Sequence, residues 1–376
     1  MRGRSGLSFI LGIMFYDLAI IGGGPAGTAA AITAARQGAR VLLVERGRFP
    51  RHKVCGEFIS PEGVGLLAGL GLEDLVGRAP RIGRARIFAS GSAAEAVLSP
   101  PAASISRDEM DYTLWQRAQD AGADCREQVE ARTISGRGPF AIATSAGDFT
   151  TRAVINASGR WSNLRRSRLS RPQREKWVGW KAHFLEAESA ESVDLYFFAD
   201  GYCGVQPLKD GRVNACAMVR ASSADSIQEV FALHPKLAER SRGWKQASET
   251  VATSPLVFAP PQAEEGGVLY AGDAAGFIDP FVGDGISLAL RSGAMAASAL
   301  QAVWEGKSSV SEAAAIYRRQ YERELRPLFR HAGWLRRLAS TPRVLRRPVM
   351  AVLRSPRVTR FLVGRTRGGA ECKMRS

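Results

Sequence analysis

The feature that most constrains the fold is a glycine pattern between a short apolar run and an alanine-rich stretch. Gly22, Gly24 and Gly27 form G-x-G-x-x-G, directly after residues 16–21 and before residues 28–37. The first glycine allows a tight turn, the second lets backbone approach a pyrophosphate, and the third lets helix and strand pack closely. The free N–H groups at the start of the helix then favour phosphate. The pattern predicts a βαβ dinucleotide-binding unit.

An acidic residue closes the second strand of this unit. Residues 41–44 form another apolar run, Glu45 ends it eighteen residues after Gly27, and Arg46 follows. A carboxylate at this position accepts hydrogen bonds from ribose hydroxyls and would repel a 2'-phosphate. Glu45 therefore disfavours NADP, whereas both NAD and FAD fit the motif.

Two further segments resemble a known flavoprotein family. Residues 271–280, followed by Gly283-Asp284-Gly285-Ile286, are similar to the second flavin motif of the geranylgeranyl reductase family, within the wider flavoprotein hydroxylase class. Residues 50–57 resemble the family's P-x-x-K-x-C-G-E segment, whose Cys-Gly part lies beside the isoalloxazine ring. The resemblance spans most of residues 16–300 and implies FAD as the cofactor.

The fingerprint and the resemblance together give the candidate site residues. Asp273 ends a strand and is expected to accept from a ribityl hydroxyl, while N–H groups after Gly283 face the flavin pyrimidine. Cys55 and Tyr202 are the candidate catalytic residues, with a small buried thiol and an ordinary core tyrosine as the alternatives. The predicted cofactor-binding residues are Gly22, Gly24, Pro25, Ala26, Gly27, Glu45, Arg46, Lys53, Cys55, Gly56, Arg107, Val129, Gly272, Asp273, Pro280, Gly283, Asp284, Gly285 and Ile286.

Two departures from the related motifs bear on the reductant and the substrate. Ser158 stands where the hydroxylases carry an aspartate linked to FAD and NADPH binding, so the external reductant, NAD(P)H or a protein electron donor, stays open. The segment that begins at Tyr202 matches the reductases' Y-x-W-x-F-P motif only at Tyr202 and Pro207, because Gly204 and Gln206 replace its other aromatic residues. A hydrophobic small-molecule substrate is still expected in this region.

The order of expected elements indicates an α/β fold, α+β overall. A Rossmann-type FAD-binding domain is expected from residues 14–80, 104–165 and 264–300. An inserted antiparallel-sheet substrate domain is expected from residues 81–103 and 166–263, since residues 177–219 alternate as short strands. Residues 301–376 form a basic C-terminal helical segment, in which residues 313–334 are expected as one helix.

The cysteines and histidines show no metal-ligand pattern. The five cysteines are widely spaced without a CxxC pair, and the four histidines are isolated, so no metal is expected. His183 is interpreted as a satisfied sheet histidine, with a substrate-facing role as the alternative. The cysteine usage favours a reduced, cytoplasmic setting, and residues 7–15 are too short an apolar run to span a bilayer.

Positive charge is concentrated near the C-terminus. Residues 318–376 hold 17 lysines and arginines against three glutamates, which is +14 of the total +16. Apolar side chains lie among these arginines, so peripheral binding to an anionic membrane surface is one expectation and a solvated helical face is the other. Nucleic acid is the least favoured partner.

The motifs fix the cofactor more narrowly than the reaction. Reduction of C=C bonds in an isoprenoid or lipid-like substrate is the first expectation, because Gly276 stands where many hydroxylases show histidine and the turn at residues 283–286 is closer to the reductases. An FAD-dependent monooxygenase acting on an aromatic or polyketide substrate is the second. A non-catalytic FAD-binding module and an NAD dehydrogenase are less favoured alternatives.

Overall fold

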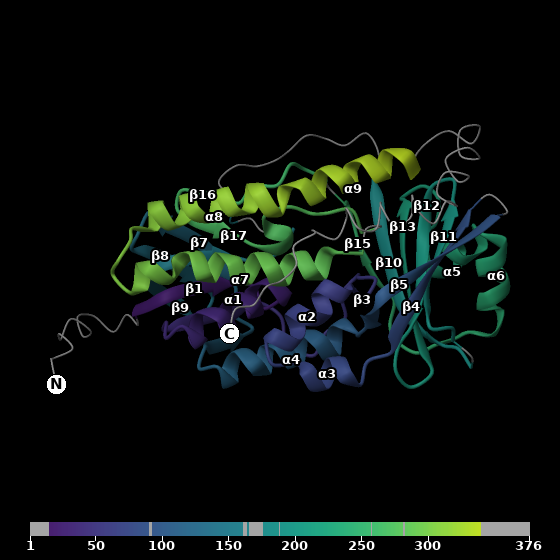
Figure 1. Ribbon diagram of the computed structural model, residues 1–376, viewed down its shortest axis with the longest axis horizontal. Helices are drawn as coiled ribbons and strands as arrows, with labels where there is room; N and C mark the ends of the chain where they lie inside the picture. Colours follow the sequence, from purple (N-terminus) through teal and green to yellow (C-terminus); the bar gives the residue numbers. More distant parts are fainter. Residues whose placement is uncertain are drawn as a thin grey trace.

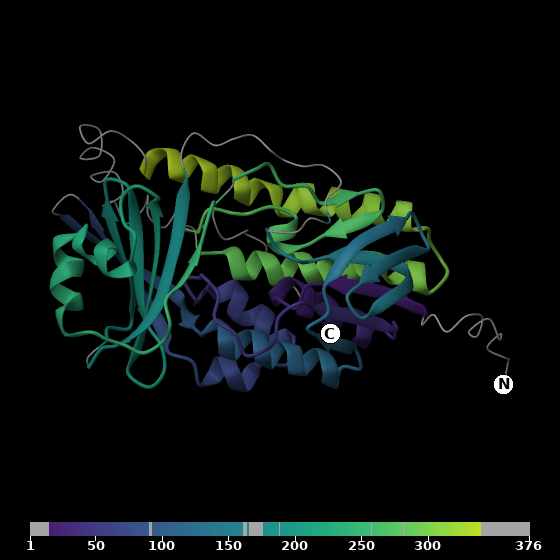
Figure 2. The same ribbon diagram turned by 180° about the vertical axis from the view of Figure 1, so that it is seen from behind.

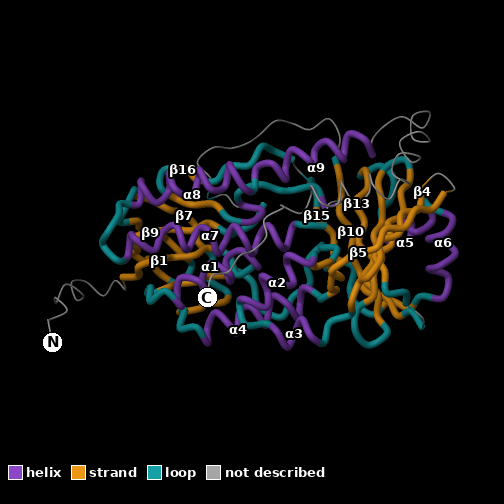
Figure 3. Tube along the Cα trace, viewed as in Figure 1, coloured by secondary structure: helices purple, strands orange, loops and turns teal. Residues whose placement is uncertain are grey.

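The computed structural model describes residues 15–89, 92–160, 164, 176–187, 189–256, 258–280 and 283–339. The described chain is elongated, with one sheet toward each end and long helices running between them (Figure 1). A view from behind shows the same two strand-rich ends (Figure 2), and Figure 3 separates them by colour. Residues 1–13 and the basic residues 340–376 lie outside the described part.

The first sheet is built around the predicted βαβ unit. Its core strands run parallel in the order β17-β9-β1-β2-β6, with β16, β8 and β7 added in antiparallel fashion. Both faces are covered, so these strands are rich in buried apolar residues. The strands are β1 (Phe15–Ile21), β2 (Val41–Glu45), β6 (Asp124–Glu127), β7 (Ala131–Gly136), β8 (Phe140–Thr144), β9 (Gly147–Asn156), β16 (Glu264–Glu265) and β17 (Val268–Tyr270).

The second sheet gathers strands from three distant stretches of the chain. Its order is β14-β10-β13-β12-β11-β4-β5-β3, with β15 also paired to β10. The pairs are antiparallel, as expected for this sheet, except for β11 with β4, which are parallel. The strands are β3 (Phe58–Ile59), β4 (Arg81–Ala89), β5 (Ser92–Ser104), β10 (Trp177–Leu185), β11 (Ser192–Phe198), β12 (Gly201–Pro207), β13 (Arg212–Arg220), β14 (Lys245–Gln246) and β15 (Val251–Thr253).

The helices divide between the two sheets. Helices α1, α4 and α7 pack beside the first sheet, α5 and α6 lie beside the second, and α8 and α9 run along one side of both ends (Figure 1). The α-helices are α1 (Pro25–Arg36), α2 (Pro61–Gly69), α3 (Glu73–Gly77), α4 (Arg107–Asp120), α5 (Ile227–Ala232), α6 (Pro235–Arg240), α7 (Gly285–Trp304), α8 (Val310–Glu324) and α9 (Arg326–Ala339). Within the described residues, short 3-10 helices include η1 (Ser241–Gly243) and η2 (Gly272–Ala274).

The single helix expected over residues 313–334 is two helices in the structure. α8 ends at Glu324, and α9 begins at Arg326. Pro327 has no N–H to continue the hydrogen-bond ladder, and its ring crowds the carbonyl of the preceding turn. The helix therefore breaks at Leu325, which is fully buried.

Helix α7 is the central helix of the fold. Within the described part of the chain it is the one helix long and apolar enough to cross a membrane by composition, but more than half of its apolar stretch is buried in the protein. It packs against α1 on one side and α8 on another. Its apolar character is explained by its place in the core.

Candidate functional site

The fingerprint glycines form a tight crossing between β1 and α1. Gly22 has a φ of +104°, and a Cβ on it would lie 2.4 Å from the carbonyl oxygen of Ala157. A Cβ on Gly27 would lie 1.8 Å from the carbonyl oxygen of Gly22. Both positions therefore require glycine, the first for its conformation and close approach and the second for helix packing.

The start of α1 offers unshielded N–H groups. Gly24 is the N-cap, it has no side-chain hydrogen bond to the helix, and Pro25 occupies the first turn. A Cβ on Gly24 would meet nothing within 4 Å, so space remains in front of this helix end. A pyrophosphate bound there would satisfy N–H groups that the helix leaves without intrahelical partners.

Helices α1 and α7 bring the two glycine-rich motifs together. A Cβ on Gly272 would lie 2.9 Å from the Cβ of Ala26, and the Gly272 N–H donates to Ser292 Oγ of α7 at 2.9 Å. Ala26 and Gly272 are 246 positions apart in the sequence and nearly touch in the fold. The fingerprint and the second motif thus face one site.

Glu45 is held by groups of the protein. Its carboxylate accepts from Gly23 N–H at 2.8 Å, from Gly47 N–H at 2.9 Å and from Arg51 Nη1 at 2.7 Å. Burial alone would raise the pKa of this carboxyl, but Arg51 and the Gly47 N–H outweigh it and lower the pKa to about 2. A carboxylate has about four lone-pair positions, so one remains for the ribose contact predicted from the sequence.

Arg51 is a cation that the protein only partly satisfies. It is fixed by Glu45 and stacks over the Phe49 ring, with 4.8 Å between its Cζ and the ring centroid. Its Nε and Nη2 are buried, and neither has a hydrogen-bond partner among the described residues. Buried donors without partners are costly, so their position beside Glu45 fits the phosphate and ribose oxygens of a dinucleotide.

The loop after Arg51 carries the remaining predicted cofactor contacts. Burial lowers the pKa of Lys53, and the positive charges of Arg51 and Arg107 lower it further, to about 8. Arg107 forms a two-point ion pair with Asp111, at 2.8 and 2.7 Å, and also interacts with the Cys55 side chain. The structure therefore brings Lys53, Cys55 and Arg107 together in one cationic region.

The second motif places its residues on both sides of the α7 start. Asp273 Oδ2 lies 3.6 Å from Arg160 Nε, and burial raises the pKa of this carboxyl. Gly283 has a φ of +74°, and a Cβ on it would lie 3.1 Å from the Phe58 ring. Asp284 and Ile286 are buried at the first turn of α7. This turn thus meets the segment that follows Cys55 and Gly56.

Three predicted residues lie at the margins of this arrangement. Val129 is buried, and its N–H donates to the Glu45 carbonyl at 3.0 Å, which places it beside the predicted ribose end. Arg46 and Pro280 are exposed on the surface. Their roles as cofactor contacts stay predictions.

Tyr202 lies in an apolar cluster on the second sheet. Tyr202, Met218 and Leu256 are its buried members, and their half-buried neighbours are Trp177, Leu195, Phe197, Phe258 and Phe277. Burial raises the pKa of the Tyr202 hydroxyl well above its usual value. Arg160 stacks on Phe277 at 4.1 Å, which links this cluster to the Asp273 side of the site. Tyr202 is therefore a core residue that also borders the region between the sheets.

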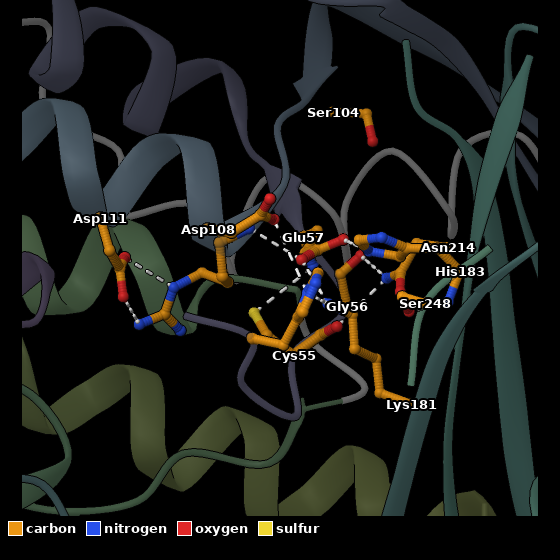
Figure 4. A network of polar contacts seen from close by, with 12 residues as sticks. Cys55, Gly56, Glu57, Ser104, Asp108, Asp111, Lys181, His183, Asn214 and Ser248 are labelled. Atoms are coloured by element: carbon orange, nitrogen blue, oxygen red, sulfur yellow. Dashed lines mark hydrogen bonds and ion pairs between the residues drawn. The ribbon is translucent and has the colours of Figure 1, made fainter. Parts of the chain in front are cut away.

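A buried charge network lies between the two sheets, and the sequence reasoning did not assemble it. Glu57 accepts from Lys181 Nζ at 2.7 Å and contacts His183 Nε2 at 2.8 Å, and all three side chains are 0% exposed. Figure 4 shows them meeting beside Cys55 and Gly56. The available signal was the alternation of Lys181 and His183 within an otherwise apolar strand, which puts both on one face.

The sequence comparisons agree with this geometry. The profile described as FAD binding domain matches residues 16–327. The chain belongs to this family of FAD-binding proteins. A menaquinone reductase of Mycobacterium tuberculosis is 28% identical over 316 residues, covering 76% of each chain. A digeranylgeranylglycerophospholipid reductase of Methanocella arvoryzae is 28% identical over 305 residues, covering 75% of this chain and 76% of the relative.

Relatives with a different reaction are also found. A flavin-dependent halogenase of Armillaria mellea is 28% identical over 359 residues, covering 81% of this chain and 71% of the relative. Among solved structures, a geranylgeranyl bacteriochlorophyll reductase-like protein of Thermoplasma acidophilum has a TM-score of 0.76 at 20% identity, covering 96% of this chain and 98% of that one. The predicted fold class and the resemblance to geranylgeranyl reductases are confirmed.

The cofactor and the general class of activity follow. The protein is an FAD-dependent oxidoreductase, which confirms the predicted cofactor and enzyme class. The unsatisfied Arg51 nitrogens, the uncapped start of α1 and the open space at Gly24 fit the phosphate-bearing part of FAD. When bound, FAD supplies hydride or electron transfer, while the protein supplies position and electrostatics.

Proposed function

We propose that the protein uses reduced FAD to saturate C=C bonds in a hydrophobic, isoprenoid or lipid-like substrate. The observation that carries the proposal is the apolar cluster around Tyr202, Met218 and Leu256, which lies beside the motif residues predicted to hold the flavin. Binding sites for hydrophobic ligands are lined mainly by apolar and aromatic side chains with few polar groups. The two relatives named as reductases support this reading.

The polar residues near this cluster are suited to orienting a substrate. Tyr202 keeps its proton at neutral pH, since the ordinary pKa of a tyrosine is 10.0 and burial raises it further, so its hydroxyl can donate. Gln206 is tied to Ser104 Oγ at 2.6 Å and is fully enclosed, so it contributes structure to β12. These contacts leave the aromatic side chains as the main determinants of specificity in the proposed site.

An FAD-dependent monooxygenase or halogenase is the second candidate. The halogenase relative supports it, and Gly204 and Gln206 depart from the reductase motif Y-x-W-x-F-P. The absence of the two aromatic side chains at these positions removes apolar lining that a long isoprenoid chain would use. Reduced flavin can serve either reaction, depending on what the protein admits to its reacting face.

Product mass separates the two candidates. Chemically reduced protein would be incubated without oxygen with a geranylgeranyl lipid or a menaquinone, and in air with phenolic substrates and halide. Gain of two hydrogens that persists after any quinol has been re-oxidised to the quinone in air supports the reductase proposal. Gain of one oxygen, or replacement of hydrogen by halogen, with no hydrogenated product, would overturn it in favour of the second candidate.

We also propose that the basic C-terminal segment brings the enzyme to anionic membranes, where such a substrate is dissolved. Its charge of +14 over residues 318–376 supports the proposal, as do the apolar residues between its arginines. Each basic residue near an anionic surface contributes about 1 kcal/mol.

A further inference from the structure

The buried network around Glu57 extends to the protein surface. Lys181 Nζ lies 2.7 Å from Glu57 Oε1 and 3.4 Å from His52 Nδ1. His52 Nδ1 in turn lies 3.7 Å from Asp108 Oδ1. The side chains of His52 and Asp108 are 33% and 27% exposed, whereas those of Glu57, Lys181 and His183 are 0% exposed. An unbroken series of ionisable groups thus connects solvent with the interior.

The inner end of this series lies at the loop closest to the flavin motifs. Asn214 Nδ2 donates to the carbonyls of Cys55 and Gly56 at 3.1 and 2.8 Å, and the Glu57 N–H donates to Cys55 Sγ at 3.3 Å. Just beyond Glu57, Phe58 contacts the Gly283 turn, and Ser60 Oγ lies 2.7 Å from Ser287 Oγ of α7. The start of α7 therefore abuts the segment that carries Glu57.

The innermost group, His183, has one ring nitrogen that takes no part in the ion pair with Glu57. His183 Nε2 contacts Glu57, while its Nδ1 is buried and has no hydrogen-bond partner within the described residues. Glu57 itself is held in a left-handed conformation, with a φ of +59°, which a non-glycine residue rarely adopts. Such strain is found at sites where position matters for function. A purely structural ion pair would require neither the strain nor the exit to solvent.

We propose that His52, Lys181, Glu57 and His183 form a proton-transfer chain between solvent and the flavin-side loop at Cys55 and Gly56. Resting on the proposed function, its role is to supply the proton that C=C reduction consumes. One carbon receives a hydride from the reduced flavin, the other receives a proton, and the flavin returns to its oxidised form. The chain then takes a replacement proton from solvent at His52, so charge and atoms balance.

The groups that face His52 change its acidity. Burial lowers the pKa of His52, and the nearby positive charge of Lys181 lowers it further, against the opposing effect of Asp108. The ionisable groups that act on His52 are Lys181, Asp108, His183 and Glu57. His52 therefore releases a proton more readily than a free histidine does, which suits a group that passes protons inward.

The test uses flavin oxidation alone, so it does not depend on the substrate. Photoreduced protein would be mixed without oxygen with at least two equivalents of ferricyanide. Each ferricyanide takes one electron, so two of them oxidise the anionic reduced flavin and one proton is released. Flavin absorbance reports electron transfer, and phenol red reports proton release. In the native protein we expect the two signals to coincide. In His52→Ala, proton release should lag behind flavin oxidation by about 10²-fold or more, as expected for loss of a positioned acid–base group.

Two further variants separate a proton chain from a merely structural network. A low concentration of imidazole should restore prompt proton release in His52→Ala, because imidazole can replace the missing side chain. The double variant Glu57→Gln with Lys181→Met removes both charges of the buried pair, leaves no unpaired charge and should show the same lag without imidazole rescue. His234→Ala, which removes a buried histidine that packs against the Tyr196 ring and takes no part in the network, should behave as the native protein.

The outcomes are distinct from those of the function test. Coincident signals in His52→Ala would overturn the proton chain. A lag that imidazole does not remove would also overturn it. Failure to detect a product with two added hydrogens would overturn the reductase proposal and leave the ferricyanide result unaffected. A lag in His52→Ala that imidazole removes would support the chain whatever the substrate.

Discussion

Gly293 of α7 lies so close to Ala26 of α1 that a Cβ on the glycine would stand 2.0 Å from the alanine carbonyl oxygen. The two helices therefore touch through their backbones at this point. Because Ala26 follows the fingerprint turn and α7 follows the second flavin motif, this contact sets the separation of the two halves of the FAD site. Neither helix can shift without moving one of the motifs.

The first prediction follows from this contact. Gly293→Ala places a methyl group against backbone that has no side chain to move aside, so it should lower the free energy of unfolding by about 1–3 kcal/mol and weaken FAD retention. Urea unfolding and the flavin content of purified protein measure the two effects. Gly65→Ala is the matched control, since Gly65 is also helical and a Cβ there meets nothing within 4 Å. The control should be neutral or stabilising.

Some parts of the fold and of the site could be predicted from the sequence, and others could not. The strand, turn and helix around Gly22 were predictable because the apolar run, the glycine spacing and the alanine-rich stretch all favour the same local structure. The turn at Gly283 was predictable from its similarity to the second flavin motif. The break at Leu325 was missed because the apolar pattern continues through Pro327. The network of Glu57 and Lys181 was also missed, because its members come from segments 124 residues apart and pair only through the fold.

A second prediction concerns Glu45. Glu45→Arg would replace the acceptor of three hydrogen bonds by a cation beside Arg51, so FAD binding should weaken by about 1–3 kcal/mol. Quenching of flavin fluorescence during titration of the FAD-free protein gives the dissociation constant. Glu130→Arg changes the charge equally at an exposed position and should leave affinity unchanged. An unaltered dissociation constant in Glu45→Arg would remove this residue from the site.

The pH dependence of stability gives a third prediction. The pKa of Glu45 is about 2 in the folded protein, below its ordinary value of 4.5, so its ionised form stabilises the fold above pH 4.5. This contribution is lost as the pH falls from 4.5 through about 2, at up to about 1.4 kcal/mol per pH unit. Glu45→Gln has no ionisable carboxyl group at this position, so it lacks this pH-dependent contribution to stability. The difference in unfolding free energy between native and variant protein should therefore shrink over this window, and a constant difference would contradict the assignment.

A fourth prediction separates catalysis from cofactor binding at Cys55. Cys55→Ser keeps a small polar atom that can accept from the Glu57 N–H, so flavin content should stay near that of the native protein. Turnover should change, because the sulfur lies at the loop predicted to face the reacting part of FAD. Steady-state kinetics on the product identified by mass measure this effect. Cys125→Ser on β6 is the control, and equal kinetics in all three proteins would make Cys55 a structural residue.

The last prediction concerns membrane association through residues 340–376, which hold ten of the basic residues and one glutamate. Full-length protein should sediment with phosphatidylglycerol vesicles at low salt and be released at high salt, because salt screens the attraction between arginines and anionic lipid. Phosphatidylcholine vesicles should bind much less. A truncation after Ala339 tests the segment while keeping all described residues, whereas removal of everything after Tyr317 would also delete the buried Tyr321, Leu325 and Leu328.

The design separates a membrane anchor from a solvated surface. If the tail is the anchor, the truncated protein should retain FAD and unfold at the same urea concentration as the full chain, yet remain in the supernatant with anionic vesicles. Even three or four arginines near the surface would contribute about 3–4 kcal/mol, which is enough for a clear difference in sedimentation. If the full-length protein stays in solution at low salt, or the folded truncation binds equally well, the basic residues serve as a solvated face. The proposal of a membrane-borne substrate would then rest on the apolar cluster around Tyr202 alone.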